Sequence, residues 1–458
     1  MKKNLKFLLI NPPVYDFSAY DAWAKPLGLL YISNILKQLR YEVVLIDCMD
    51  RNLQGTPSKS NGTGKFLYEI VPKPEVFSDV PLHYKRYGIT RKQISEILSN
   101  NKDADFVLIT SVMTYWYLGV QEVIFLVKEF IPDAKIVLGG ILPTLLPSFT
   151  YLFFGNTISQ YFAGNRVGDF IATITSKNEP SYQFNEFQNF PAPDYSFYKN
   201  LSYVVIRTSY GCFYNCDYCS CRKIIPHYQF KDPQKIASEI NFLYNISNTQ
   251  NFVFYDDALF NVELNKTKDL FYELLKLPFR VKYYTPNGIS PKFIDKEFAK
   301  LLFDLNFVDL RLSLETTNDN VHSIVDKKID LKNFLITLEN LFAVGFRSDN
   351  ISVYILAGLP QEKIEDVYRS AELLHKYGLR IRLCELSPVP KSKLFYYYNL
   401  DKNTDPLYYN NTTFLFTGIP RKVSPWCSYE ELQNLKSFIK NLNKNLEEKD
   451  VRHTCTSV

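Results

Sequence analysis

Short apolar segments that alternate with helical segments are the feature that most constrains the fold of this 458-residue chain. In its first part, strands are predicted at 7–10, 42–46, 106–110 and 135–138, with helices at 27–39 and 120–130. Strands this short and this apolar, separated by helices, are typical of a parallel sheet covered on both faces. We therefore predict a Rossmann-like, doubly wound domain over residues 1–175, with ligands beyond the carboxyl ends of its strands.

The segment between Arg51 and Asn101 interrupts this alternation, since it is rich in Lys, Pro and Tyr and fits neither the helical nor the strand period. A long irregular segment inside a domain is more often functional than an empty spacer. We expect it to lack regular structure and to contact a ligand or a partner.

The alternation resumes after a polar linker, placed at residues 176–200. Strands are predicted at 203–207, 251–255, 281–285, 308–314, 351–357 and 381–386, with helices in the intervals. Six successive strand–helix units predict a partial (β/α)6 barrel over residues 201–394, with its chemistry at the carboxyl ends of the strands. A small C-terminal helical region, 395–458, ends in an amphipathic helix at 429–446. The fold class is α/β.

Composition and charge exclude several classes of protein. Apolar residues make up 46% and charged residues 22%, the balance of a globular chain rather than a disordered one. Lys plus Arg (53) barely exceeds Asp plus Glu (48), so a nucleic acid is not the expected partner.

No membrane span and no export signal are expected. The uncharged segment 136–165 is long enough to span a bilayer, but glycines and prolines interrupt it, which favours a buried strand, a loop and a docking helix. The apolar run after Lys6 is too short for a signal peptide, so we expect a cytoplasmic protein.

Four of the eight cysteines lie within ten positions, and three of them, Cys212, Cys216 and Cys219, fall in the loop after the first predicted barrel strand. Thiolates at spacings of four and three can each ligate one iron of a cubane cluster and leave the fourth iron open. Zinc is the alternative, with His227 and Cys221 as further ligands, although zinc sites usually have a second pair at matched spacing. The other cysteines, Cys48, Cys384, Cys427 and Cys455, are too dispersed to predict a second cluster.

This cysteine spacing, with the aromatic Tyr218 before the last cysteine, resembles the signature of the radical S-adenosylmethionine (SAM) superfamily. The resemblance implies that Cys212, Cys216 and Cys219 bind a 4Fe-4S cluster, whose open iron is chelated by SAM. One-electron cleavage of SAM would then produce a 5′-deoxyadenosyl radical. Tyr218 would pack on the adenine.

Polar motifs follow other predicted strands, where the barrel places its chemistry. Asp256 and Asp257 end the second strand, where a carboxylate can bind the methionine ammonium; the alternative is a pair that caps the next helix. Ser313 and Glu315 end the fourth strand, where the family commonly binds the ribose. The turn 358–362 resembles the family's Gly-Leu-Pro-Gly-Glu turn, with Gln361 replacing a glycine.

The first domain resembles the cobalamin-binding domain of one large branch of the superfamily. The matching pieces are Asn11-Pro12-Pro13, Pro26-Leu27-Gly28, Asp47, Ser111, Thr114, Gly139 and Gly140. The resemblance implies that Ser111, Thr114, Gly139 and Gly140 contact cobalamin.

One position departs from the cobalamin pattern, because Met49 stands where a cobalt-ligating histidine is usual. A thioether is a poor ligand for cobalt(III), so we expect Met49 to be apolar lining of the site. Cobalamin then binds without a histidine ligand, which we favour, or has been lost. The aromatic run 115–117 either floors the corrin site or is core at the domain interface.

Together, the two cofactors imply a radical SAM methyltransferase that acts on an unactivated carbon or phosphorus. The alternative is a radical SAM cyclase, oxidoreductase or rearrangement enzyme without methyl transfer, with cobalamin auxiliary or absent. A methylthiotransferase would need a second cysteine trio, and a non-enzymatic cluster sensor would not need Tyr218, Asp257 and Glu315. The expected partners are an electron donor such as flavodoxin or ferredoxin and a substrate, small molecule, lipid or peptide, that no residue specifies. No catalytic proton donor is assigned.

Overall fold

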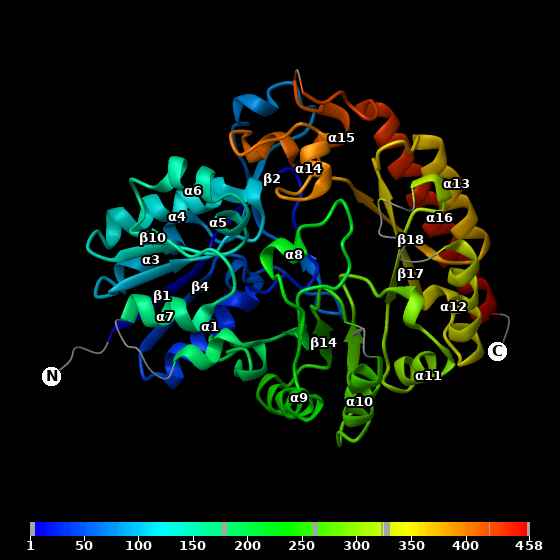
Figure 1. Cartoon of the computed structure of the whole chain (residues 1–458), viewed down its shortest axis with the longest axis horizontal. Coiled ribbons are helices and arrows are strands. Elements are labelled where there is room, and N and C mark those ends of the chain that lie inside the picture. The colour runs from blue at the N-terminus through cyan, green and yellow to red at the C-terminus, as the bar shows by residue number, and fades with distance from the viewer. Residues whose placement is uncertain are drawn as a thin grey trace.

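A five-stranded parallel sheet organises the first part of the chain (Figure 1). The computed structural model describes residues 5–175, 181–259, 264–321, 324, 330–420 and 422–455. The strands are β1 (Lys6–Asn11), β4 (Glu42–Asp47), β8 (Phe106–Ile109), β9 (Lys135–Leu138) and β10 (Gln160–Tyr161), in the order β10-β9-β8-β1-β4. All neighbouring strands are parallel, as predicted.

Strand β1 shows why helices cover both faces of this sheet, because its buried side chains alternate between two cores. Phe7 and Leu9 pack in the core that contains α1 (Leu27–Gln38) and α7 (Val167–Thr175). Leu8 and Ile10 pack in the core that contains α3 (Arg91–Ser99) and α4 (Tyr117–Phe130). Side chains of a strand point alternately to opposite faces, so an all-apolar strand requires cover on both. The doubly wound prediction is confirmed.

The segment between Arg51 and Asn101 is not irregular, and that expectation is wrong. It contains helix α3, whose first turn is closed by a capping box between Thr90 and Gln93. Its short strands β6 (Tyr68–Ile70) and β7 (Lys85–Tyr87) form an antiparallel sheet with β2 (Val14–Asp16), and β5 (Gly64–Lys65) pairs with β3 (Tyr20–Asp21). These strands are two or three residues long, too short to leave a period in the sequence. A contact with a ligand or partner stays a prediction.

The second part of the chain is a partial barrel of six parallel strands, which confirms the predicted fold class. The strands are β11 (Val204–Ile206), β14 (Asn251–Phe254), β15 (Lys282–Tyr284), β16 (Leu310–Glu315), β17 (Ile351–Ala357) and β18 (Arg380–Glu385). They form two three-stranded sheets, β11-β14-β15 and β16-β17-β18. Single bridges, Tyr283 with Phe307 and Ile289 with Leu312, join the two sheets.

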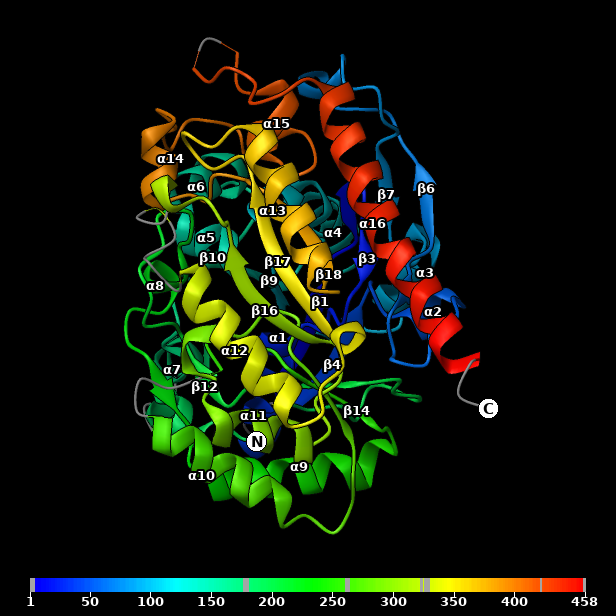
Figure 2. The same cartoon turned by 90° about the vertical axis from the view of Figure 1, so that its right-hand side faces the viewer.

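Helices cover the outside of this barrel, one after another in chain order in Figure 1, and Figure 2 shows them from the side. They are α9 (Pro233–Ser247), α10 (Leu264–Leu275), α11 (Lys296–Asp304), α12 (Leu331–Ala343) and α13 (Ile364–Lys376). The C-terminal helix α16 (Tyr429–Cys455) lies against α13 and β18, and is longer than the predicted 429–446. No helix among the described residues is both long enough and apolar enough to cross a bilayer.

The structure describes the linker from residue 181 onward, and its first residues, 176–180, lie outside the described residues. Phe187 and Phe190 pack on Tyr31 of α1 and on Tyr210 of the barrel. The uncharged segment 136–165 contains β9, α5 (Ile141–Leu145), α6 (Pro147–Phe154) and β10. The predicted domain boundaries stay predictions; helix α14 (Lys393–Tyr397) runs across the one at 395.

The loop after β1 is held against the start of α4, and Gly119 permits this close approach. An ideal Cβ on Gly119 would lie 1.8 Å from the Pro13 carbonyl oxygen, whereas one on Gly28 of α1 would have no neighbour within 4 Å. We predict that Gly119→Ala lowers the free energy of unfolding by about 1–3 kcal/mol, because the Pro13 loop must move. Gly28→Ala is the matched control and should be neutral or stabilising by up to about 1 kcal/mol, since alanine favours a helix. Urea titrations measure both, and equal midpoints would contradict the prediction.

Candidate functional site

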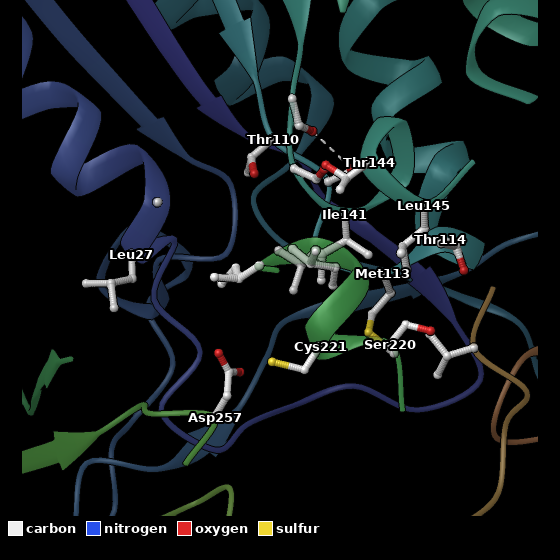
Figure 3. A pocket seen from close by; sticks show the side chains of 18 of the residues that line it. Leu27, Thr110, Met113, Thr114, Ile141, Thr144, Leu145, Ser220, Cys221 and Asp257 are labelled. Carbon is white, nitrogen blue, oxygen red and sulfur yellow. Dashed lines mark hydrogen bonds between the residues drawn. The ribbon is translucent and has the colours of Figure 1, made fainter. Parts of the chain in front are cut away.

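A cavity of about 660 Å³ lies between the carboxyl ends of the two sets of parallel strands (Figure 3). The first domain lines it with the start of α1 and with the turns after β8 and β9. The barrel lines it with the end of the cysteine loop and with the ends of β14 and β18, and Tyr409 and Asn411 of the C-terminal region complete the wall. The cavity is thus shared by segments that are far apart in the sequence.

The glycine turn after β9 forms one wall of the cavity and is tied to the turn after β8. Gly140 has φ +93°, and a Cβ on it would lie 2.4 Å from the Ser111 carbonyl oxygen, so this approach requires glycine. The Ser111 hydroxyl donates to the Gly139 carbonyl at 3.1 Å and accepts from the Leu142 backbone N–H at 3.0 Å. Ser111, Thr114, Gly139 and Gly140, predicted from the sequence to share a site, all line the cavity.

Met49 does not line the cavity, so that expectation is wrong. It packs with Val14, Phe66 and Tyr87 in a separate small core, because the antiparallel strands of the 51–101 segment cover the end of β4. Met113, in the turn after β8, lines the cavity instead, and Figure 3 shows its side chain beside Ser220. The described lining contains no histidine.

The cysteine loop begins on a buried carboxylate. Asp256 Oδ1 accepts hydrogen bonds from the Thr208 backbone N–H at 2.9 Å, from the Thr208 hydroxyl at 3.0 Å and from the Ser209 hydroxyl at 2.7 Å. Its other oxygen, Oδ2, is buried without a hydrogen-bond partner, and burial raises the pKa of Asp256 to about 6. Asp256 does not line the cavity. Asp256 therefore positions the cysteine loop from behind the cavity wall.

Asp257, the second residue of the pair, does face the cavity (Figure 3). Its Oδ2 accepts a hydrogen bond from Arg207 Nη1 at 3.1 Å. Burial alone would lower the pKa of Arg207, but Asp257, Tyr210 and Asp256 together outweigh it and the pKa is raised. A carboxylate shared with one guanidinium retains lone pairs for a further cationic ligand.

The three predicted cluster cysteines differ in exposure: Cys216 is buried, Cys212 is partly exposed and Cys219 is exposed. Tyr218, Cys219 and Cys221 line the cavity, and the Cys221 backbone N–H donates to Cys219 Sγ at 3.4 Å. Within the described residues, no three His, Cys, Asp or Glu side chains converge closely enough to hold a single metal ion. A donor set that is all thiol and spread along one loop fits a cubane, which offers a separate iron to each thiolate.

The end of β16 holds Tyr218 in place. A register shift falls between Ser313 and Glu315, and Glu315 has φ +72°. The Tyr218 hydroxyl donates to Glu315 Oε1 at 3.0 Å. Ser313 is buried, and its Oγ lies 2.4 Å from where a Cβ on Gly288 would be. Neither Ser313 nor Glu315 lines the cavity itself.

In the turn after β17, Gln361 stands where the family has a glycine. Its φ of +68° is the left-handed conformation that glycine adopts most easily. Glu362, the next residue, is buried and accepts a hydrogen bond from the Thr316 hydroxyl at 2.6 Å. Burial raises the pKa of Glu362 to about 7. The turn is therefore tied to the end of β16 by a buried carboxyl group.

Besides Lys25, just before α1, sequence reasoning missed two charged residues of the cavity wall, Arg207 and Glu385. Glu385 ends β18 and pairs with Lys436 of α16 at 2.9 Å, and burial raises its pKa. Both residues lie at the carboxyl end of a predicted strand, and this position could have identified them as candidate site residues. Lys436 comes from the C-terminal helix and had no such signal.

Comparison with known protein families agrees with this geometry. Residues 206–374 match the family model described as the radical SAM superfamily. These residues form a radical SAM domain. Such a domain implies a 4Fe-4S cluster and SAM. A curated relative, mycofactocin maturase MftC from Mycolicibacterium smegmatis (strain ATCC 700084 / mc(2)155), is 29% identical over 114 residues; the match covers 24% of this chain and 28% of that protein.

Solved structures share the fold of nearly the whole chain, including the sheet that precedes the radical SAM domain. The radical SAM methyltransferase TsrM from Kitasatospora setae, with tryptophan and a SAM analogue bound, superposes with a TM-score of 0.67 at 16% identity, over 95% of this chain and 88% of that one. The cobalamin-dependent radical enzyme OxsB, with aqua-cobalamin and SAM bound, gives 0.57 at 14% identity, over 96% of this chain and 56% of that one. The chain thus shares the fold of these two proteins over nearly its whole length.

A buried aspartate, Asp16, ties the first domain to the C-terminal region. Asp16 accepts hydrogen bonds from Trp116 Nε1 at 2.6 Å and from Asn410 Nδ2 at 3.0 Å, so it joins the turn after β8 to the loop that carries Tyr409. Of the aromatic run, Tyr115 lines the cavity, while Trp116 belongs to this interface. Burial raises the pKa of Asp16 to about 6 despite these hydrogen bonds.

This raised pKa predicts a pH dependence of stability. Between about pH 4 and pH 6 the folded protein keeps the Asp16 proton while the unfolded chain has lost it, so this group's contribution to the free energy of unfolding falls as the pH rises. The fall approaches about 3 kcal/mol, from a shift of about two pKa units. Asp16→Asn cannot titrate, so it should lower stability overall and flatten the slope between pH 4 and pH 6. Urea titrations at several pH values measure it, and parallel curves would refute the assignment.

Proposed function

We propose that the protein is a cobalamin-dependent radical SAM methyltransferase that acts on an unactivated carbon. One observation carries the proposal: Tyr218 and Cys219 of the cysteine loop share a single cavity with Gly139 and Gly140 of the glycine turn. A cluster carrying SAM, bound on the cysteine-loop side, would face a corrin bound on the glycine-turn side across that space. The likeness to TsrM and OxsB, whose structures hold such groups, supports it.

On the barrel side, Cys212, Cys216 and Cys219 would ligate the cluster, and Cys219 would present it to the cavity. Asp257 would bind the methionine ammonium by a charge-assisted hydrogen bond, with Arg207 holding the carboxylate in place. Tyr218, fixed by Glu315, would pack on the adenine. Ser313 and Asp256 would support these residues rather than contact SAM, since both are buried and neither lines the cavity.

On the first-domain side, Gly139 and Gly140 would let a bulky cofactor reach the backbone, and Ser111 and Thr114 would contact it. Cobalamin, when bound, supplies the chemistry of a methyl carrier, which no side chain can provide. With no histidine in the described lining and Met113 facing the space, cobalt would have no imidazole ligand from this wall.

The protein's own part is to position the reactants and to exclude water. SAM, when bound, would supply a 5′-deoxyadenosyl radical by one-electron cleavage, with methionine as the other product, and this radical would take a hydrogen atom from the substrate. The apolar wall formed by Leu356, Leu386 and Val389 would keep water from that radical. Glu385 is a carboxylate on the same wall that a polar substrate group can reach.

A second candidate is a radical SAM cyclase, oxidoreductase or rearrangement enzyme, and the absence of histidine from the described lining favours it. The products of SAM discriminate the two. Reduced with dithionite, a methyltransferase loaded with cobalamin releases both S-adenosylhomocysteine and 5′-deoxyadenosine, whereas the unloaded protein releases 5′-deoxyadenosine alone. The second candidate yields no S-adenosylhomocysteine in either state. A protein that cleaves no SAM under these conditions is neither.

Replacing the cluster cysteines tests the ligand assignment. We predict that Cys212→Ala, Cys216→Ala and Cys219→Ala each abolish the brown absorption and lower iron and sulfide content several-fold after anaerobic reconstitution. Cys427→Ala is the control, because Cys427 is a buried cysteine packed in the core rather than on the loop. Iron retained at the control level in the Cys216 variant would show that the assignment is wrong.

Filling the glycine turn tests the corrin site. Gly139 has an ordinary φ, and a Cβ on it would meet nothing closer than 3.9 Å, so valine adds methyl groups to the cavity without a backbone clash. We predict that the wild type keeps a corrin spectrum after incubation with hydroxocobalamin and desalting. In Gly139→Val, the retained corrin absorption should be at least about tenfold lower. Iron content should not change. A colourless wild-type eluate would overturn the corrin site.

A further inference from the structure

A cluster of basic side chains lies on the surface next to the cysteine loop, and we name it the α8 patch: Arg222, Lys223 and Lys391. Helix α8 (Cys221–Ile224) begins two residues after Cys219, and Arg222 and Lys223 on it are exposed. Its Ser220 hydroxyl donates to the Pro390 carbonyl at 2.6 Å, which brings Lys391 to the same rim. Lys391 in turn donates to the Thr144 carbonyl of α5 at 2.7 Å.

The charges of the α8 patch are not neutralised by the part of the chain that the structure describes. Among the described residues, no ion pair joins Arg222, Lys223 or Lys391 to a carboxylate, and the nearby Asp217 is already paired with Lys393 at 2.6 Å. Burial lowers the pKa of Lys391, and Lys223 lowers it further, which shows that the two ammonium groups repel each other. Like charges held together without a counter-charge are typical of a surface that binds an anionic partner.

The position of the patch indicates what kind of anion it receives. None of its three residues lines the cavity, so it does not bind a group within the site. It lies beside Cys219, the most exposed of the three cysteines. Helix α14 lies on the same side of the molecule in both views and adds two exposed aromatic rings, Tyr396 (60%) and Tyr397 (59%) (Figures 1 and 2). A basic rim with aromatic neighbours is a surface for a protein.

We propose that the α8 patch is the docking face for an acidic one-electron carrier protein. The inference rests on the proposed function, which needs one electron at the cysteine loop for each SAM cleaved. The carrier is oxidised by one electron, which passes to the group held by the three cysteines, and no proton or other group is exchanged. Charge attraction would orient the carrier with its redox centre toward Cys219.

The experiment compares two reductants on the reconstituted full-length enzyme: flavodoxin hydroquinone, which must dock, and dithionite, which need not. In Arg222→Glu/Lys223→Glu, we expect flavodoxin-driven formation of 5′-deoxyadenosine to fall at least about tenfold at low salt, because steering changes association rates by this order. Dithionite-driven formation should not change. The control Lys128→Glu/Lys440→Glu makes the same charge change on α4 and α16 and should resemble the wild type with both reductants.

Binding gives a second readout that does not depend on turnover. We expect the affinity for oxidised flavodoxin to fall at least about tenfold in the patch variant, and zero-length carbodiimide cross-links to join Lys223 or Lys391 to flavodoxin carboxylates. Unchanged affinity with unchanged flavodoxin-driven rates would overturn the proposal, as would an equal loss with dithionite, which would mean that the patch serves a reactant. Failure of both reductants in the wild type would count against the proposed function, while the binding assay still decides the docking face.

Discussion

Four buried aspartates hold the two halves of the molecule together, and the cavity depends on them. Asp16 accepts from Asn410, Asp21 from Tyr203 at 2.7 Å and Asp47 from Tyr198 at 2.8 Å, while Asp194 accepts from Ser33 of α1 at 2.6 Å. Hydrogen bonds to charged groups contribute roughly 1.5–3 kcal/mol each, and removing one partner leaves a buried charge without compensation. These hydrogen bonds fix the first domain against the linker, the barrel and the C-terminal region, and the glycine turn and the cysteine loop line one cavity between these parts. The distance between the turn and the loop decides whether two reactants can meet.

Within the site, the residues that face the cavity are held by residues that do not. Asp256 anchors the start of the cysteine loop, Glu315 holds Tyr218, and Arg207 holds Asp257. Each support comes from the end of a neighbouring strand, so the parallel sheets position both the contacting groups and their partners. The left-handed backbone at Glu315 and Gln361 lies at the same ends. Backbone strain of this kind persists only where the surrounding structure holds it.

The rim of the cavity connects the cysteine loop to the surface. The proposed chemistry starts with one electron, and that electron needs a route from the surface to the loop. Helix α8 gives the cysteine loop both an inner side, with Cys221 on the cavity, and an outer side, with Arg222 and Lys223 exposed. The cavity itself offers an apolar wall and one further carboxylate, Glu385, held by Lys436 of the C-terminal helix. The C-terminal region therefore contributes to the site as well as covering the barrel.

The sequence by itself determined the βα order, the doubly wound sheet, the partial barrel and the loop that carries Cys212, Cys216 and Cys219, because periodicity and spacing are local properties of a chain. The resemblance to cobalamin-binding domains also pointed to Ser111, Thr114, Gly139 and Gly140, and all four line the cavity because parallel strands end at one edge. Only the tertiary structure decided that Asp257 and not Asp256 faces the cavity, that Met113 and not Met49 lines it, and that Lys436 reaches Glu385. Neighbouring residues of a turn point in different directions, and residues far apart meet only when the halves pack, so no local pattern carries this information.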